Sequence, residues 1–268
     1  MIFANHAHIY PKEIRPSGSI DSLKKLMENC SIDKCVAFAT FPDRFKDSGL
    51  DMNQNQWLAD KIKTDSSLVG FGTIDFENKD LKGQVDEISD CGFKGIKLHP
   101  QAQEFKVDSE EAFEIYSRAE ELGLFITFHT GVHWHRLRDN NVLLFDEVAY
   151  NFKNLRFSME HIGGFSFFKE ALAVMVNNKR DGRQPRIFAG WTSIFGNDKD
   201  AWSLTDEQLE TLLFQTSDNN SIFGLDFPFK DEQYISNSIQ RIQSMNLSKL
   251  TKEKILGGNL ERELFGSL

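Results

Sequence analysis

The sequence lacks an excess of positive charge, a long apolar run and a cysteine framework, and each absence argues against a class of protein. Its 31 Lys and Arg stand against 40 Asp and Glu, giving a net charge of −9. That balance argues against nucleic acid or an anionic membrane surface as the main partner. No apolar run reaches the roughly 18 residues that a membrane span needs.

Cysteine is equally scarce, with three residues and no C-x-x-C spacing. An odd number without such a spacing argues against a disulfide framework and fits a reducing compartment. The N-terminus shows no basic segment followed by an apolar one, so we expect no signal peptide. We therefore predict a cytoplasmic protein that acts on a small molecule and binds neither nucleic acid nor a membrane.

Low-complexity tracts and linkers rich in proline or serine are also absent, and short strand-like segments alternate with longer helical ones. Several of the strand-like segments are almost continuously apolar, as expected for parallel strands that are covered on both faces. Their starts are separated by roughly 25 to 35 residues, the length of one βα unit. The eight expected strands begin near Ile2, Lys34, Leu68, Phe93, Leu124, Leu155, Arg186 and Ser221.

This alternation predicts an α/β fold in which residues 1–268 form a single (β/α)8 TIM barrel. A doubly wound open sheet is the competing architecture, and it usually carries a glycine-rich turn after its first strand. Here that turn reads HAHIYPKE, without glycine, which favours the barrel. Between the fourth and fifth strands we expect a helix that Asp108 or Ser109 caps and that Gly123 ends.

Histidines gather where the predicted strands end, which in such a barrel is the position of the active site. A two-residue spacing on a strand puts His6 and His8 on one face, and paired imidazoles suit a borderline metal such as zinc. A pair of hydrogen-bonded structural histidines is the alternative. His99 ends the fourth strand. The combination of four histidines and one carboxylate on four other strand ends favours a metal site, and these residues are His6, His8, His129, His161 and Asp226.

Other polar residues near these strand ends are candidates for substrate binding. Lys97 shares a strand face with His99 and could bind substrate, pair inside the barrel, or carry a carboxylated amine that bridges two metals. His133 and His135 form a second HxH in the loop beyond the fifth strand, where substrate contact competes with plain exposure. An anionic, planar substrate could contact Trp134, Arg136, Arg138 and Trp191, for which solvated loop positions are the alternative. No G-x-S-x-G is present, so a nucleophilic serine is not indicated.

Six segments together resemble the amidohydrolase superfamily: NHAHIYP, GFKGIKLHP, ITFHTG, MEHIGG, FGLDFPF and KILGGNLERELF. The resemblance covers essentially the whole chain. It is strongest to the amidohydrolase-related branch, which includes aminocarboxymuconate-semialdehyde decarboxylase and pyrone-dicarboxylate lactonase. TatD-type nucleases also have an early HxH, but an acidic residue is expected there at the fourth strand, where this chain has Lys97-x-His99.

The resemblance implies a metal-dependent barrel enzyme in which His6, His8, His129 and Asp226 hold one divalent metal. His161 would orient or deprotonate the metal-activated water, and Asp226 would relay the proton to a leaving group. One ion is preferred, although a second ion joins the last histidine in some relatives. Three neutral imidazoles and one carboxylate would leave a Zn²⁺ site with a net charge near +1, enough to bring the pKa of its water to about 7.

We therefore predict a metal-dependent hydrolase that acts on a small carboxylated or cyclic substrate, such as a lactone or an amide. A non-oxidative decarboxylase of an unsaturated or aromatic carboxylic acid is the alternative, because the branch contains both and the motifs do not separate them. A catalytically inactive barrel that binds a ligand is a third hypothesis. Substrate contacts are assigned to Lys97, His99, His133, Arg136 and Trp191, and a homo-oligomer is compatible with the sequence.

Overall fold

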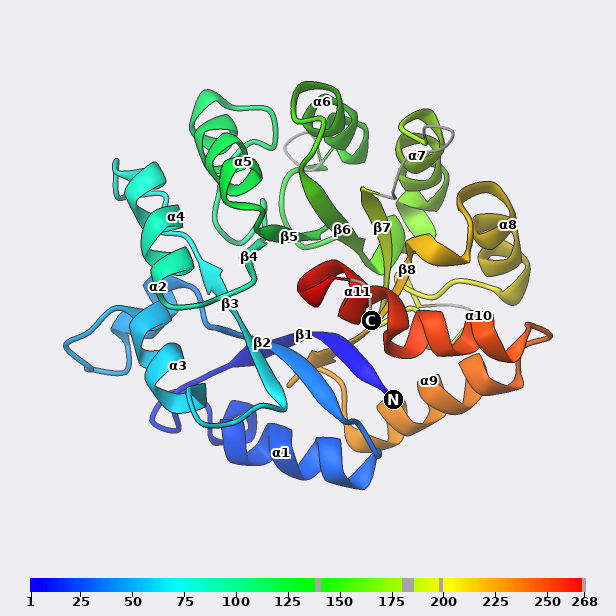
Figure 1. The fold of residues 1–268 in the computed structure, drawn as a ribbon, viewed down its shortest axis with the longest axis horizontal. Coiled ribbons are helices and arrows are strands. Elements are labelled where there is room, and N and C mark those ends of the chain that lie inside the picture. Colours follow the sequence, from blue (N-terminus) through cyan, green and yellow to red (C-terminus); the bar gives the residue numbers. More distant parts are fainter. Residues whose placement is uncertain (138–140, 180–185, 198–199, 267–268) are drawn as a thin grey trace.

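The computed structural model describes residues 1–137, 141–179, 186–197 and 200–266. Arg138, one of the loop residues named above, lies outside these ranges. Eight parallel strands close into a barrel in chain order, with β8 paired back onto β1, and helices surround them (Figure 1). The predicted TIM barrel is confirmed, and each strand begins within two residues of its predicted start. The strands are β1 Phe3–Ile9, β2 Lys34–Ala39, β3 Leu68–Thr73, β4 Gly95–Leu98, β5 Phe125–His129, β6 Arg156–Glu160, β7 Ile187–Thr192 and β8 Ser221–Phe227.

The helices follow the strands, and short helical turns lie between several elements. Of the two N-cap candidates for α5, Ser109 is the cap, since its side chain accepts from the Ala112 amide, and Gly123 ends the helix with a φ of 67° as predicted. No helix among the described residues is long and apolar enough to span a membrane. The helices are α1 Ile20–Asn29, α2 Pro42–Lys46, α3 Gln54–Ile62, α4 Leu81–Asp90, α5 Glu110–Leu122, α6 Phe145–Asn151, α7 Gly164–Asn177, α8 Asp206–Thr216, α9 Glu232–Ser244, α10 Lys249–Glu253 and α11 Asn259–Phe265.

The strands divide the core into an outer and an inner part. Outward-pointing residues pack against the helices, and inward-pointing residues from the early part of the strands fill the floor of the barrel. Leu260 and Leu264 of α11 join this inner cluster, and Figure 1 shows α11 lying over the centre of the barrel. The floor is thereby closed by apolar side chains, so an active site has room only towards the carboxyl ends of the strands.

Strand β1 departs from regular alternation at His6. Asn5 points into the barrel, where its amide reaches Thr127 and Glu160, so strict alternation would put Ala7 inside and both histidines outside. The register with β2 instead shifts between Ala4 and Ala7, and His6 has a φ of 72°. This bulge turns both imidazoles inwards, with their Nε2 atoms 3.2 Å apart. The histidines share one face as predicted, but the bulge is what places them there.

Candidate active site

A cavity of about 630 Å³ opens at the carboxyl ends of the strands. It lies at the end of the barrel that the strand-end argument selected, and its walls come from elements far apart in the sequence. All six strand-end residues line it, namely His6, His8, His99, His129, His161 and Asp226. The barrel therefore gathers these residues around a single space.

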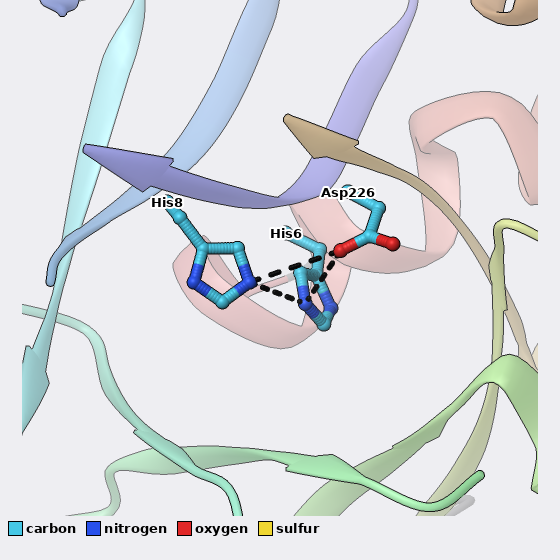
Figure 2. A group of neighbouring side chains, drawn as sticks. All are labelled: His6, His8 and Asp226. Carbon is cyan, nitrogen blue, oxygen red and sulfur yellow. Dashed lines mark hydrogen bonds and ion pairs between the residues drawn. The ribbon is translucent and has the colours of Figure 1, made fainter. Parts of the chain in front are cut away.

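Three of these residues form a compact group of potential metal ligands. Nε2 of His6 lies 3.2 Å from Nε2 of His8, and Asp226 Oδ1 lies 3.6 and 3.8 Å from these two nitrogens. Figure 2 shows the two imidazoles of β1 and the carboxylate of β8 converging on one point. Ligand atoms that bind one first-row metal ion at about 2.1 Å are separated by similar distances. The donor set therefore fits a divalent metal.

The protonation states of these three residues also suit a divalent metal ion. Burial is the main cause that lowers the pKa of His6 and of His8 well below the usual range, and nearby positive charge adds to it. Both imidazoles are thus neutral and offer lone pairs. Burial would raise the pKa of Asp226, but His6, His161 and the Ser193 hydroxyl outweigh it and lower that pKa. The group accordingly presents two neutral nitrogens and one anionic oxygen.

His129, the fourth ligand that the resemblance implied, lies apart from this group. It ends β5, on the opposite side of the barrel from β1, and its ring stacks on that of His99. The group whose donor atoms all lie within 4.8 Å of one another contains His6, His8 and Asp226 without it. Its Nε2 atom is buried and has no hydrogen-bond partner among the described residues. An unpaired buried nitrogen that faces a shared cavity suits a ligand to the same ion.

His161 is held in one tautomer. Its Nδ1 lies 2.8 Å from the carbonyl oxygen of Thr192, which can only accept, so Nδ1 carries the proton and Nε2 keeps its lone pair. Burial lowers the pKa of His161, and the charge of Asp226 opposes this shift. The ring centroid lies 5.5 Å from that of His6, within the ~10 Å that a site around one metal allows. His161 is therefore placed to act as a proton acceptor.

Lys97 lies in the barrel interior and does not line the cavity. Its side chain is fully buried, and its Nζ has no hydrogen-bond partner among the described residues. Burial lowers the pKa of Lys97 to about 8, against the opposing charges of Glu160 and Asp226. The structure thus puts the predicted substrate cation out of contact with the cavity.

The remaining substrate candidates separate into two groups. His133 lines the cavity, with its ring 4.6 Å from that of His99. Trp191 points outwards into the core between strands and helices, where it packs against Phe195. Arg136 is exposed and does not line the cavity. Trp191 and Arg136 are therefore not brought to the other site residues.

Several cavity residues carry no signal in the sequence. The Arg15 guanidinium lies 4.8 Å from the centre of the Phe229 ring and forms no ion pair with any described residue. Trp202, from the loop after β7, packs edge-on against His161 at 4.6 Å. Both come from loops, whose folded positions no motif marks. The aromatic walls and the cation make the cavity suited to a planar anion.

Comparison with known proteins places the chain in a family and a fold. Residues 6–264 match the sequence pattern of the family described as Amidohydrolase, whereas the comparison with curated proteins found no significant match. An uncharacterised TIM-barrel protein from Bordetella bronchiseptica is similar, with 18% identity over 98% of both chains and a TM-score of 0.77.

Two similar solved structures have named activities. One is 2,6-dihydroxybenzoate decarboxylase from Rhizobium, with 14% identity, 98% of both chains covered and a TM-score of 0.70. The other is 5-carboxyvanillate decarboxylase from Novosphingobium aromaticivorans, complexed with manganese. It has 14% identity, 98% of this chain and 96% of that chain covered, and a TM-score of 0.73. At these identities the likeness establishes the shared fold.

Proposed function

Because the chain belongs to the amidohydrolase family, we propose that it is a metal-dependent hydrolase of a small carboxylated or cyclic substrate. The observation that carries the proposal is the convergence of His6, His8 and Asp226 in the cavity, with donor atoms within 4.8 Å of one another. We assign these three residues and His129 as the ligands of one divalent ion. Zinc is our first choice for three imidazoles with one carboxylate, and the manganese in a similar structure makes that metal the second choice.

The metal, when bound, would supply a Lewis acid that polarises the substrate and activates water. The chain's own side chains would carry out the proton transfers. His161 would accept the proton of the attacking water at Nε2, since Nδ1 donates to the Thr192 carbonyl oxygen. Asp226 Oδ2, which accepts from the Ser193 hydroxyl at 2.6 Å, would relay this proton from His161 to the leaving group.

Substrate recognition in this proposal rests on the cavity walls. Arg15, with no carboxylate partner among the described residues, would pair with an anionic group of the substrate. Phe41, Phe229 and Trp202 would hold a planar ring between them. His99 and His133 keep the substrate contacts predicted for them, because both line the cavity.

A non-oxidative decarboxylase of an aromatic carboxylic acid is the second candidate. It is favoured by the names of two similar structures, both decarboxylases of substituted benzoic acids. The same cation, aromatic walls and metal ligands would accept such a substrate.

Isotope labelling separates the two reactions. The metal-loaded protein is supplied with aromatic and unsaturated lactones, amides and carboxylic acids in ¹⁸O-labelled water and, separately, in D₂O. A hydrolase would place ¹⁸O in the product carboxylate, whereas a decarboxylase would release CO₂ and place deuterium on carbon. Ligand binding without turnover of any class would favour the inactive barrel.

We also propose that residues 1–268 form one domain and that the protein is cytoplasmic. The family match over residues 6–264 supports the first statement, and three free cysteines support the second.

A further inference from the structure

Glu160 is a fully buried carboxylate at the end of β6 that the mechanism above does not use. Its Oε1 accepts a hydrogen bond from the Asn5 amide at 2.9 Å and another from the Ser158 hydroxyl at 2.5 Å. Its Oε2 accepts from the Thr192 hydroxyl. Three donors on three different strands hold the carboxylate in place.

The neighbouring strands leave room for this carboxylate. A Cβ atom on Gly190 of β7 would lie 2.5 to 2.6 Å from the carboxylate atoms of Glu160, so only glycine fits there. In β8, a Cβ atom on Gly224 would clash with the hydroxyl of Thr192, which donates to Glu160. Gly190 thus makes room for the Glu160 carboxylate itself, and Gly224 makes room for the hydroxyl that donates to it.

The remaining face of Glu160 meets His6. Oε2 lies 3.1 Å from His6 Nδ1, and that nitrogen is buried and makes no hydrogen bond with the described residues. The other ring nitrogen, Nε2, is the one that lies near His8 and Asp226. A neutral imidazole carries one proton, so a proton held on Nδ1 leaves the lone pair on Nε2.

We propose that Glu160 is a positioning residue that holds the proton of His6 on Nδ1 and so directs the Nε2 lone pair to the metal ion. A carboxylate behind a ligating histidine fixes the tautomer of the ring and raises the basicity of the ligand. The inference rests on the proposed function, because it assumes that His6 binds a metal.

A purely structural pairing with Lys97 is the competing explanation. Lys97 is the buried cation whose charge interacts with Glu160, but its Nζ has no hydrogen-bond partner among the described residues. Glu160 instead accepts from Asn5, Ser158 and Thr192, which leaves one acceptor position of the carboxylate free. The remaining polar contact of Glu160 is the one between Oε2 and His6 Nδ1, at 3.1 Å.

The test compares Glu160→Gln with Ser158→Ala as the matched control. Both variants disturb the same buried network, but of the two Glu160 oxygens Ser158 contacts Oε1 and not Oε2, the oxygen that faces His6. Titration of each metal-free protein with Zn²⁺ and with Mn²⁺ gives the dissociation constants. We expect Glu160→Gln to weaken binding by about 10- to 100-fold and Ser158→Ala to weaken it by less than about 3-fold. Equal affinities for Glu160→Gln and the wild type would overturn the inference.

A second readout does not depend on metal affinity. Two-bond ¹H–¹⁵N spectra of the metal-free protein report which nitrogen of each histidine is protonated, and a His6→Asn variant identifies the His6 signals. We expect the Nδ1–H tautomer in the wild type and loss of its predominance in Glu160→Gln. An Nε2–H tautomer in the wild type would refute the inference even if Glu160→Gln binds metal poorly. Failure of the wild type to bind either metal would instead refute the proposed function.

Discussion

The rings of His99 and His129 lie parallel, with 3.8 Å between their centroids and 6° between their planes. The stack lies between the ends of β4 and β5, and His129 is not part of the compact ligand group of β1 and β8. Only part of the proposed ligand set is therefore preassembled.

We therefore expect His6 and His8 to contribute more to metal binding than His129. The double variant His6→Ala/His8→Ala should lose the metal, whereas His129→Ala should weaken binding by at least about 10-fold, since removal of a ligand should cost no less than removal of a group that supports one. His133→Ala is the control, because His133 lines the cavity but does not belong to the ligand group. Elemental analysis and metal titration give the occupancies. Full occupancy in the double variant would contradict the ligand assignment.

Removal of His161 should separate catalysis from metal binding. His161→Ala should keep nearly the wild-type metal content, because the proposed ligands do not include it, and should lower kcat by about 10²- to 10⁴-fold. The measurement is kcat on the substrate class found by the isotope experiment, together with metal content. Simultaneous loss of metal would make His161 a ligand, and an unchanged kcat would remove it from the mechanism.

Arg15 should govern the affinity for an anionic substrate. Arg15→Gln should raise KM for a carboxylated substrate by about 10- to 100-fold, the equivalent of a charge-assisted hydrogen bond of about 1.5–3 kcal/mol, with a smaller change in kcat. Arg44→Gln is the matched control, because Arg44 lines the same cavity but is exposed and lies 3.8 Å from Asp47. Equal effects of the two substitutions would argue against a specific anion contact at Arg15.

Lys97 should make the stability of the protein depend on pH. Its pKa is about 8 in the folded protein, against an ordinary value of 10.5 for a solvated lysine, so between these values the unfolded chain holds a proton that the folded one has released. Stability therefore rises with pH across this window. Lys97→Met should be more stable than the wild type at pH 7 by up to about 3 kcal/mol, and this advantage should shrink as pH rises towards about 10.5.

Urea unfolding of the metal-free proteins at several pH values measures this difference. Lys82→Met, at an exposed position of α4, is the control and should change stability by no more than about 0.5 kcal/mol. A constant difference between the wild type and Lys97→Met over the whole window would show that Lys97 does not titrate there.

The architecture was predictable from the sequence because it depends on local and repeated features. Apolar strands at the spacing of one βα unit indicate a barrel, and the barrel brings all carboxyl strand ends to one side. That rule alone gathers residues as distant as His6, His129 and Asp226 around one cavity. Ser109 and Gly123 are local signals of the same kind, and both act as predicted.

The direction of individual side chains was decided only by the tertiary structure. Both faces of a barrel strand are buried, so no contrast between polar and apolar residues shows which face points inwards. Trp191 therefore points outwards although its neighbour Thr192 points in, and Trp202, from a loop, borders His161 instead. The bulge at His6 also reverses the alternation of β1, and it shifts the register of that strand against both of its neighbours, β2 and β8. The sequence thus determines which residues can bind a metal, whereas the pairing of distant strands brings them to one point.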